Sequence, residues 1–331
     1  MILCIDVPAQ HGGAMTILNQ YFDYAKKSRE EWVFVLSTPE FITQDNIKVL
    51  NYPWVKKSWF HRLYFDYVKA PKIINELKPN EVISLQNVLV PRTKIQQTLY
   101  LHQPLPFSDI RFSLFKYPRL WVYQNIISRL IFRSIKKAKK VIVQTHWMKR
   151  LVLEKTSMDY KEKVMVEQPR INHQINEYYS EKKEDVVYFF YPASQETYKN
   201  HRAIVEALQE ESLKPYFRHF KVVFTLYGNE NKEIAKLSRE VQKHSLPIDF
   251  IGSIPLQKVY DYYKTSILIF PSYIETFGLP LLEAKLHRTP IIAANRPFSN
   301  EILENYEHVH YFEPFDTQTL AQLILNAIQS S

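Results

Sequence analysis

Two carboxylates stand eight positions apart around a predicted turn, Glu275 before it and Glu283 after it. A short apolar run precedes the turn and is typical of a buried parallel strand, whereas the residues after the turn favour a helix. Gly278 permits a backbone conformation that other residues resist, so the turn can be sharp. The backbone N–H groups of residues 276–278 would then point at a ligand above the helix N-terminus. A diphosphate binds in such a place because the free N–H groups and the helix dipole both favour negative charge.

The same segment resembles the donor-site motif of the retaining glycosyltransferases of family 4, also called glycosyl transferases group 1, which have the two-domain GT-B fold. The matching positions are Pro271, Ser272, Glu275, Phe277, Gly278, Leu279, Pro280, Glu283 and Ala284. An ordinary strand, loop and helix with two surface glutamates is the alternative, and the number of matching positions disfavours it. The resemblance implies that Glu283 binds the ribose of a nucleotide sugar and that Glu275, the candidate catalytic carboxylate, binds hydroxyls of the donor sugar. It also implies donor binding by Thr276, Phe277, Gly278 and Leu279.

A second motif of the same family follows the predicted strand at residues 186–191. Lys199 matches the lysine that neutralises the donor diphosphate in the family, and Asn200 is expected to be a helix N-cap. The arginine of the family falls on Ser194, so one expected positive charge is missing. A lone surface lysine is the alternative for Lys199. Gly228 ends another predicted strand, where the family has a glycine near the nucleotide, and is a further donor-binding candidate.

In the first half of the chain, the glycine pair Gly12 and Gly13 lies between the first predicted strand and the first predicted helix. This is the usual place of a phosphate-facing turn, although the G-x-G-x-x-G fingerprint of dinucleotide-binding proteins is absent. In the related glycosyltransferases such a pair approaches the donor, and a histidine at the position of His102 lies near the transferred sugar. The resemblance therefore makes Gly12 and Gly13 donor-binding candidates and His102 a catalytic candidate. The alternatives are a plain tight turn and a buried histidine that is satisfied by the protein.

The order of predicted strands and helices indicates an α/β protein with parallel sheets covered by helices on both faces. At 331 residues the chain is longer than one core usually grows, so two domains are expected. We assign residues 1–170 to an N-terminal Rossmann-like domain on the acceptor and membrane side, 171–185 to a polar linker, and 186–331 to a C-terminal donor-binding domain. The resemblance implies that the two domains face each other across a cleft, as in GT-B proteins. The last helix is a candidate to pack back on the N-terminal domain.

Positive charge is concentrated in the N-terminal half. Residues 1–170 contain 27 Lys and Arg against 14 Asp and Glu, and the stretch from Arg111 to Lys155 contains 12 bases and one acid. Apolar residues in this stretch recur at helical spacing, which predicts a basic amphipathic helix. Such a helix suits an anionic membrane surface, which is our expectation. A solvated basic face over a core helix and a nucleic-acid surface are the alternatives, and we expect no nucleic acid as a partner.

The chain has no run of about 18 uncharged apolar residues, no Asp-x-Asp sequence and no His, Asp and Glu cluster with metal-ligand spacing. We therefore expect no transmembrane helix, no metal and no cofactor, since the nucleotide sugar is a substrate. The N-terminal residues are typical of a core strand and not of a signal peptide, and the single cysteine, Cys4, fits a reducing compartment. The expectation is a cytoplasmic protein, peripheral on the inner face of the plasma membrane.

Together with these features, the resemblance implies a retaining, nucleotide-sugar-dependent hexosyltransferase that acts on a glycan or a lipid-linked glycan, in the synthesis of a bacterial surface polysaccharide such as capsule or O-antigen. Two alternatives stay open. A GT-B sugar-nucleotide epimerase would share the fold and the diphosphate site but release a free sugar. A non-catalytic, membrane-associated partner protein would keep the fold and lose the donor. Glu275 and Glu283 argue against this second alternative, and the missing arginine at Ser194 argues for it.

Overall fold

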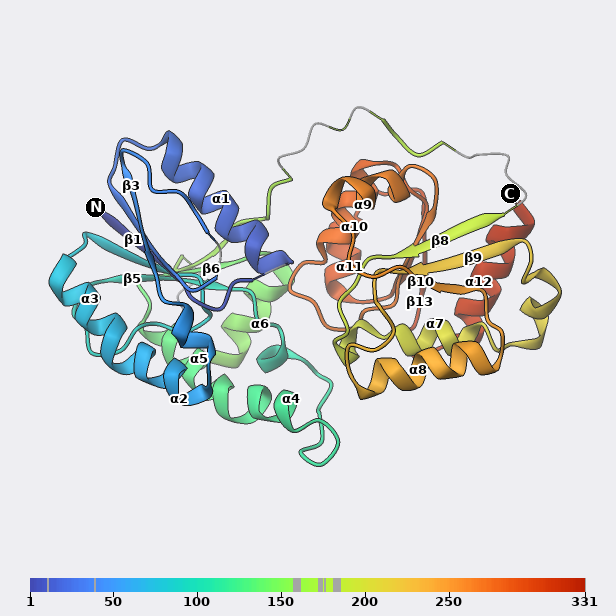
Figure 1. Ribbon diagram of the computed structural model, residues 1–331, viewed down its shortest axis with the longest axis horizontal. Coiled ribbons are helices and arrows are strands. Elements are labelled where there is room, and N and C mark those ends of the chain that lie inside the picture. The colour runs from blue at the N-terminus through green and yellow to red at the C-terminus, as the bar shows by residue number, and fades with distance from the viewer. Residues whose placement is uncertain are drawn as a thin grey trace. The chain divides into compact units, whose positions relative to one another are not determined.

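The computed structural model describes residues 1–10, 12–38, 40–156, 162–171, 175, 177–180 and 186–330. The chain divides into two compact units, Met1–Arg170 and Ile171–Ser331, and each contains one sheet with helices packed against it (Figure 1). The division falls at the start of the polar stretch expected as a linker, residues 171–185, most of which lies outside the described ranges.

The described part of the first domain is built on a seven-stranded sheet in which all neighbouring strands are parallel. Its strands are β1 (Ile2–Asp6), β2 (Trp32–Leu36), β3 (Ile47–Asn51), β4 (Glu81–Ser84), β5 (Gln97–Leu101), β6 (Lys140–Val143) and β7 (Val164–Val166). The order across the sheet is β3-β2-β1-β4-β5-β6-β7, so the direction of strand addition reverses between β1 and β4. In open parallel sheets, ligands bind outside the carboxyl ends of the strands at such a reversal point.

Helices provide the long crossover connections that parallel strands need. They are α1 (Gly13–Lys27), α2 (Trp59–Tyr64), α3 (Ala70–Leu77), α4 (Pro118–Val122), α5 (Ser128–Lys137) and α6 (His146–Thr156), with the 3-10 turns η1 (Pro53–Lys56) and η3 (Leu105–Phe107) and the π turns η2 (Phe65–Lys69) and η4 (Tyr123–Ile127). The stretch from Trp59 to Leu77 is thus one continuous helix that contains the π turn η2. The amphipathic helix expected between Arg111 and Lys155 runs from Pro118 to Lys137 and contains the other π turn, η4.

Alternate side chains of the strands enter separate cores on the two faces of the first sheet. On β1, Cys4 belongs to the cluster that contains Phe22 of α1, whereas Leu3 belongs to the cluster that contains Phe65 of η2. This period of two follows from the pleat of a strand. Both faces are therefore buried, which explains the nearly continuous apolar sequence of the strands. Cys4 is fully buried, as expected for a small apolar residue of the core.

The described part of the second domain has a six-stranded parallel sheet in the order β10-β9-β8-β11-β12-β13, with its reversal between β8 and β11. The strands are β8 (Val187–Tyr191), β9 (Phe220–Phe224), β10 (Ile248–Phe250), β11 (Ile267–Phe270), β12 (Ile291–Ala294) and β13 (Val309–Phe312). The helices are α7 (His201–Ala207), α8 (Lys232–Lys243), α9 (Leu256–Tyr263), α10 (Leu279–Leu286), α11 (Pro297–Ile302) and α12 (Thr317–Ser330), with the 3-10 turns η5 (Thr197–Lys199) and η6 (Glu211–Tyr216). The last helix, α12, packs against α7 and η6 of this same domain.

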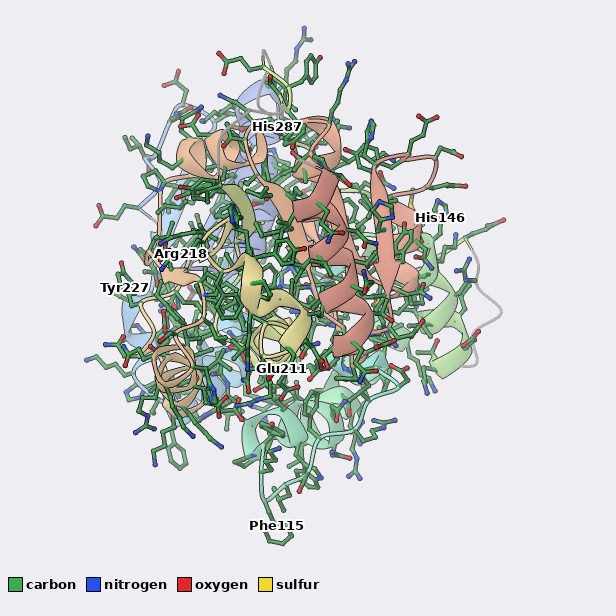
Figure 2. All side chains as sticks on the ribbon, turned by 90° about the vertical axis from the view of Figure 1, so that its right-hand side faces the viewer. Phe115, His146, Glu211, Arg218, Tyr227 and His287 are labelled. Atoms are coloured by element: carbon green, nitrogen blue, oxygen red, sulfur yellow. The ribbon has the colours of Figure 1, made fainter. Side chains whose placement is uncertain are left out.

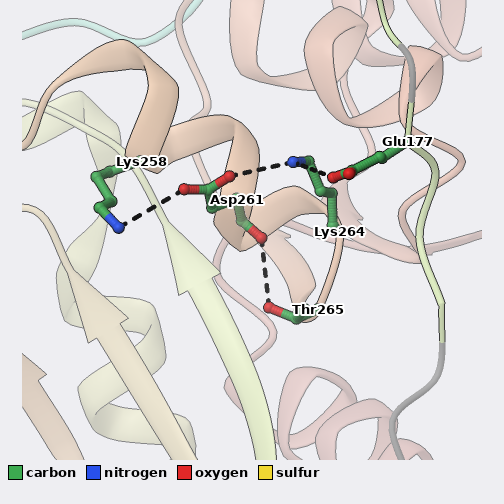
Figure 3. Close-up of polar contacts among 5 residues, drawn as sticks. All are labelled: Glu177, Lys258, Asp261, Lys264 and Thr265. Atoms are coloured by element: carbon green, nitrogen blue, oxygen red, sulfur yellow. Dashed lines mark hydrogen bonds and ion pairs between the residues drawn. The ribbon is translucent and has the colours of Figure 1, made fainter.

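Residues 177–180, which lead into the sheet of the second domain, are hydrogen-bonded to the ends of α9 and α10. The Tyr179 N–H donates to the His287 carbonyl oxygen at 2.7 Å, and the Ser180 N–H donates to the Lys264 carbonyl oxygen at 3.0 Å. The ammonium group of Lys264 also forms an ion pair with Glu177 at 2.6 Å (Figure 3). Because Glu177 is exposed, this ion pair contributes little, and the two backbone hydrogen bonds are the firmer attachment.

Asp6 ends β1 at the reversal point of the first sheet and is almost completely buried. Neither of its carboxylate oxygens has a hydrogen-bond partner in good geometry among the described residues. Burial raises the pKa of Asp6 to about 8, although the Ala9 backbone N–H, Arg62 and Lys56 act in the opposite direction. The carboxyl group is therefore protonated at neutral pH, because an ionised carboxylate without a close partner is strongly disfavoured in the protein interior.

We predict that Asp6→Asn removes a pH dependence of stability. At pH values between the ordinary pKa of Asp and about 8, Asp6 keeps its proton in the folded protein but has released it in the unfolded chain. The free energy of unfolding of the wild type should therefore fall as pH rises through this window, by an amount on the order of a few kcal/mol, and the neutral amide should abolish this component. Urea unfolding of both proteins at about pH 5 and about pH 8 measures it. An equal fall in the two proteins would contradict a raised pKa of Asp6.

Candidate active site

Two loops leave the second sheet side by side at its reversal point. One follows β8 and contains Lys199 in η5, and the other follows β11 and contains Glu275. Because β8 and β11 are parallel neighbours, both loops start at the carboxyl edge of the sheet. A backbone hydrogen bond from the Tyr273 N–H to the Tyr198 carbonyl oxygen, at 3.1 Å, joins them. The topology thus brings together two motifs that are far apart in the sequence.

The side chains of Lys199 and Glu275 are in direct contact. Lys199 Nζ donates a hydrogen bond to Glu275 Oε1, and Ser272 Oγ donates to the same oxygen at 2.8 Å. Both charged side chains are largely shielded from solvent, with exposed fractions of 19% and 14%. Ser272 had no assigned role in the sequence motif, and the structure shows that it orients Glu275. A cation and a carboxylate are therefore held together at the place where an open parallel sheet binds ligands.

Asn200 stands at the N-cap position of α7, but its side chain makes no capping hydrogen bond, so the expected cap is wrong. Its backbone is left-handed, with φ 60°, and its amide group donates instead to the carbonyl oxygens of Pro314 at 2.7 Å and Pro271 at 3.3 Å. An N-cap residue normally has an extended backbone, which is what lets its side chain reach the first N–H groups of the helix. Asn200 therefore ties the loop of Lys199 to the loop that follows β11. Tyr191 Oη supports the same turn by donating to the Lys199 carbonyl oxygen at 2.6 Å.

Gly278 has a left-handed backbone with φ 91° and immediately precedes α10, which confirms the expected sharp turn. A Cβ atom at this position would lie 3.3 Å from Leu281 Cδ1, so both the backbone and the space favour glycine. The helix starts at Leu279, where the Gly278 carbonyl oxygen accepts from the Leu281 N–H at 2.9 Å. Thr276 and Phe277 are buried. Their candidate role in binding a donor therefore falls mainly on their backbone N–H groups.

Glu283 lies inside α10, where Tyr263 Oη of α9 donates to its Oε2 at 3.0 Å. Burial raises the pKa of Glu283 to about 7, and the hydrogen bond from Tyr263 acts in the opposite direction. The carboxyl group is thus poised between its two protonation states near neutral pH. In its ionised form it can accept two hydroxyl hydrogen bonds, such as those of a ribose diol. The sequence analysis missed Tyr263, because a tyrosine on the preceding helix carries no motif.

Gly228 lies four residues beyond the end of β9 with φ 88°, and its N–H donates to Glu230 Oε2 at 3.1 Å. The ring of the neighbouring Tyr227 covers Gly252, since a Cβ atom at Gly252 would lie 2.3 Å from Tyr227 Cε1. Tyr227 is nevertheless 68% exposed and projects from the domain (Figure 2). An exposed aromatic ring at the carboxyl edge of the sheet offers a face on which a nucleotide base can stack. The sequence analysis did not single out Tyr227. Gly252, which follows β10, could have indicated that a side chain packs closely there.

The first domain carries three further candidates at the carboxyl edge of its own sheet. Gly12 has φ 65° and caps α1, and Gly13 is the first residue of α1. A Cβ atom at Gly12 would meet no atom within 4 Å, so the backbone conformation alone calls for glycine. His102 follows β5, with its N–H bonded to Asn87 Oδ1 at 2.7 Å and its buried Nδ1 without a partner among the described residues. Burial lowers the pKa of His102 to about 4, so the imidazole is neutral at physiological pH.

Cations at the second-domain edge are fewer than the family motif supplies. Ser194, where related sequences have arginine, is exposed in the loop after β8. Lys199 is the cation that the structure holds against Glu275. Within the described ranges, no group of three or more His, Cys, Asp or Glu side chains is placed to hold a metal ion.

The basic stretch from Arg111 to Lys155 contains α4, η4 and α5, which form the expected amphipathic helix. Ile131 is buried on its inner side, whereas Arg133 and Lys136 are exposed. In the loop before α4, Phe115 is 97% exposed and its side chain projects from the first domain (Figure 2). No helix in the described part of the chain has both the length and the apolar character that crossing a bilayer requires.

The family model described as Glycosyl transferases group 1 matches residues 172–331. Over 268 residues the chain is 22% identical to the O-antigen chain mannosyltransferase RfbU of Salmonella typhimurium, an alignment that covers 80% of this chain and 70% of RfbU. The crystal structure of WaaG, a glycosyltransferase involved in lipopolysaccharide biosynthesis, is similar with a TM-score of 0.77 at 14% identity, over 99% of this chain and 90% of WaaG. HepE of Anabaena, solved in complex with UDP-glucose, has a TM-score of 0.67 at 16% identity, over 99% of this chain and 90% of HepE. At these identities the structural likeness shows the fold.

The expected fold is confirmed, with two Rossmann-like domains built on parallel sheets as in GT-B glycosyltransferases. The family match covers the domain in which Lys199 and Glu275 meet at the carboxyl edge of the sheet and Glu283 lies on the following helix, α10. The second domain therefore belongs to the group 1 glycosyl transferases, and the comparisons together support a nucleotide-sugar-dependent glycosyltransferase.

Proposed function

We propose that this glycosyltransferase moves a hexosyl group, with retention of anomeric configuration, from a nucleoside diphosphate sugar to a glycan or a lipid-linked glycan. RfbU is named an O-antigen chain mannosyltransferase and WaaG is described as acting in lipopolysaccharide biosynthesis, which supports a role in the synthesis of a bacterial surface polysaccharide. The reaction would take place in the cytoplasm, with the enzyme peripheral on the inner face of the plasma membrane.

The observation that carries the proposal is the contact between Lys199 and Glu275 at the reversal point of the second sheet. A cation beside a carboxylate suits the two halves of a sugar donor. Lys199 attracts the diphosphate, and Glu275 accepts hydrogen bonds from hydroxyls of the attached sugar. The bond that breaks lies between these two halves. Binding of the donor across Lys199 and Glu275 therefore places the leaving group and the sugar carbon at the boundary between the two side chains.

In this proposal, catalysis consists largely of stabilising the departing nucleoside diphosphate and an oxocarbenium-like sugar. The backbone N–H groups of residues 276–278 and the ammonium group of Lys199 meet the negative charge that grows on the leaving group. Glu283 holds the ribose through its carboxylate. From the first domain, the loop of Gly12 and Gly13 approaches the donor, and the neutral His102 exchanges a hydrogen bond with a sugar hydroxyl. We propose no metal and no cofactor.

Changing each glutamate to glutamine should separate their roles. Glu283→Gln is expected to weaken donor binding, whereas Glu275→Gln is expected to lower turnover more than donor affinity. A lost charge-assisted hydrogen bond costs about 1.5–3 kcal/mol, which is roughly 10- to 150-fold. Steady-state kinetics together with calorimetric titration of the donor measure the two effects. Glu240→Gln on α8 is a matched control, since Glu240 forms an ion pair with Arg202 and belongs to neither of the two loops that contain Lys199 and Glu275. Near-normal kinetics in both site variants would reject the assigned roles.

Lys199→Ala should bind a free nucleoside diphosphate at least about tenfold more weakly than the wild type, because a charge-assisted contact to the diphosphate is lost and Ser194 supplies no other cation. Isothermal titration calorimetry measures this affinity. Lys221→Ala is the matched control, since it removes the same charge from an ion pair with Asp249 in the same domain. Equal affinity of Lys199→Ala and the wild type would place the diphosphate elsewhere.

We further propose that the first domain docks on an anionic membrane through exposed bases of the stretch from Arg111 to Lys155. Each base near an anionic surface contributes about 1 kcal/mol, and this contribution is screened within a Debye length of roughly 8 Å at physiological salt. The 12 bases cannot all face one plane, so the total is a few kcal/mol and the binding is reversible.

Replacement of four bases by glutamine should reduce flotation with anionic liposomes and leave transfer to a short soluble acceptor analogue intact. The four are Arg133, Lys136, Lys137 and Lys140. High salt should weaken the wild type in the same assay because it screens exposed charges. A control variant removes four exposed bases from α8 of the second domain, which are Lys232, Lys236, Arg239 and Lys243. Equal flotation with neutral and anionic vesicles, or no effect of the first four changes, would reject this surface.

A further inference from the structure

The helix formed by α2 and the π turn η2 directs large apolar side chains toward solvent. They are Trp59, Phe60, Leu63, Tyr64, Tyr67 and Val68, and we call them the α2–η2 stripe. Trp59 is 60% exposed and Phe60 is 84% exposed. Scattered exposed apolar residues are ordinary on a protein surface, but a contiguous group of this size usually marks an interaction site.

The π turn keeps the α2–η2 stripe on one face of the helix. The six residues form three pairs at four-residue steps. In an α-helix four residues overshoot a full turn, since one turn takes 3.6 residues. In a π turn, which is closed by hydrogen bonds from residue i to residue i+5, four residues fall short of a full turn. Because η2 directly follows α2, the overshoot and the shortfall compensate, and the three pairs stay aligned.

The inward face of the same helix carries an ion pair on either side of the buried ring of Phe65. Arg62 Nε donates to Asp66 Oδ2 at 2.7 Å, and Arg62 Nη2 donates to Gln86 Oε1 at 3.0 Å. Both members of the ion pair are mostly shielded from solvent, and Phe65 between them is fully buried. A surface helix of a soluble domain normally buries its apolar side and exposes its charges. Here an ion pair faces inward and six apolar side chains face outward, which is the arrangement of a helix whose outer side is covered by an apolar phase.

The charges and residue types around the α2–η2 stripe indicate that the apolar phase is a lipid surface. Residues 54–78 contain six bases and two acids, and both acids pair with bases of the same helix. Three of the exposed residues, Trp59, Tyr64 and Tyr67, are of the types that concentrate at the headgroup level of a bilayer. The loop before α4, which contains the exposed Phe115, lies on the same side of the first domain as α2 (Figure 1).

We propose that the α2–η2 stripe inserts into the interfacial layer of an anionic lipid bilayer. The proposal rests on the membrane docking proposed above for its choice of partner, and it adds an apolar insertion by residues outside the basic stretch. Electrostatic attraction brings the domain to the surface, and burial of the aromatic side chains then holds it there. The stripe shares no residue with the proposed donor site.

The double variant Phe60→Ser/Leu63→Ser tests the insertion when the full chain is sedimented with anionic and with zwitterionic vesicles. We expect at least tenfold weaker partition onto both kinds of vesicle, because the lost apolar area acts whatever the headgroup charge. The matched control is Tyr24→Ser/Ile42→Ser, which removes two exposed apolar side chains of the same domain outside the stripe and should partition like the wild type. Wild-type partition by Phe60→Ser/Leu63→Ser would overturn the proposal.

Brominated lipids give a second measurement, because they quench tryptophan fluorescence only at the depth where the bromine lies. Wild-type fluorescence should fall when the protein binds brominated vesicles, and Trp59→Phe should lack this quenched component. Bound protein without quenching would contradict insertion of the stripe.

Other outcomes distinguish insertion of the stripe from docking through the basic stretch, from dimer formation and from the proposed donor chemistry. If the four-base variant loses binding to anionic vesicles while Phe60→Ser/Leu63→Ser binds normally, the basic surface stands and the stripe is rejected. If light scattering shows a dimer that Phe60→Ser/Leu63→Ser abolishes, and the wild type binds no vesicles, the stripe belongs to a second copy of the chain. Titration with a nucleoside diphosphate is run in parallel. A wild type that binds vesicles but no nucleotide would reject the proposed donor chemistry and leave the stripe intact.

Discussion

Burial of both sheets on both faces is the constraint from which the rest of the structure follows. Strands that are covered by helices on two sides leave no polar face, so polar chemistry is confined to their ends. In a parallel sheet all carboxyl ends lie along one edge, and the reversal of strand order leaves space there. Lys199 and Glu275 meet at this edge although 76 positions separate them. In the first domain the same rule places Asp6 at the end of β1 and His102 just beyond β5.

Burial also makes ionised groups unfavourable near the carboxyl edges of the sheets. Hydrogen-bond partners then determine how far the pKa of each buried carboxyl group is raised. Burial raises the pKa of both Asp6 and Glu283. Glu283 receives a hydrogen bond from Tyr263, which favours its ionised form, and its pKa stays near neutral. Ligand hydroxyls can therefore draw it into the charged state at little cost. Asp6 has no such bond within the described residues and is held neutral at the base of the loop that leads to Gly12.

The sequence predicted what depends on local pattern and missed what depends on tertiary contact. Strands buried on two faces give a continuous apolar signal, whereas β3 at the sheet edge has exposed polar residues and was not predicted. Gly278 and Lys199 were found because a motif fixes the backbone around them. The bond of Tyr263 to Glu283 crosses between two helices, and no local pattern encodes it. Asn200 was recognised as the residue before a helix, but its left-handed backbone, and hence its bonds to two distant loops, could be known only from the packed structure.

Because Ser194 stands where related sequences have arginine, the proposed reaction depends on Lys199 as a cation for the diphosphate, and Lys199 is already paired with Glu275. In the proposed reaction, a diphosphate competes with the carboxylate of Glu275 for the ammonium group of Lys199, because these two side chains are already in contact. Glu275 is only 14% exposed, so without its cation it would keep the Ser272 hydroxyl and little solvent. A complete donor offsets this loss, since its sugar hydroxyls become the new partners of Glu275. The product diphosphate brings no such hydroxyls to that position. In this proposal the ion pair would favour the whole donor over the product, and its re-formation after transfer would assist release of the nucleoside diphosphate.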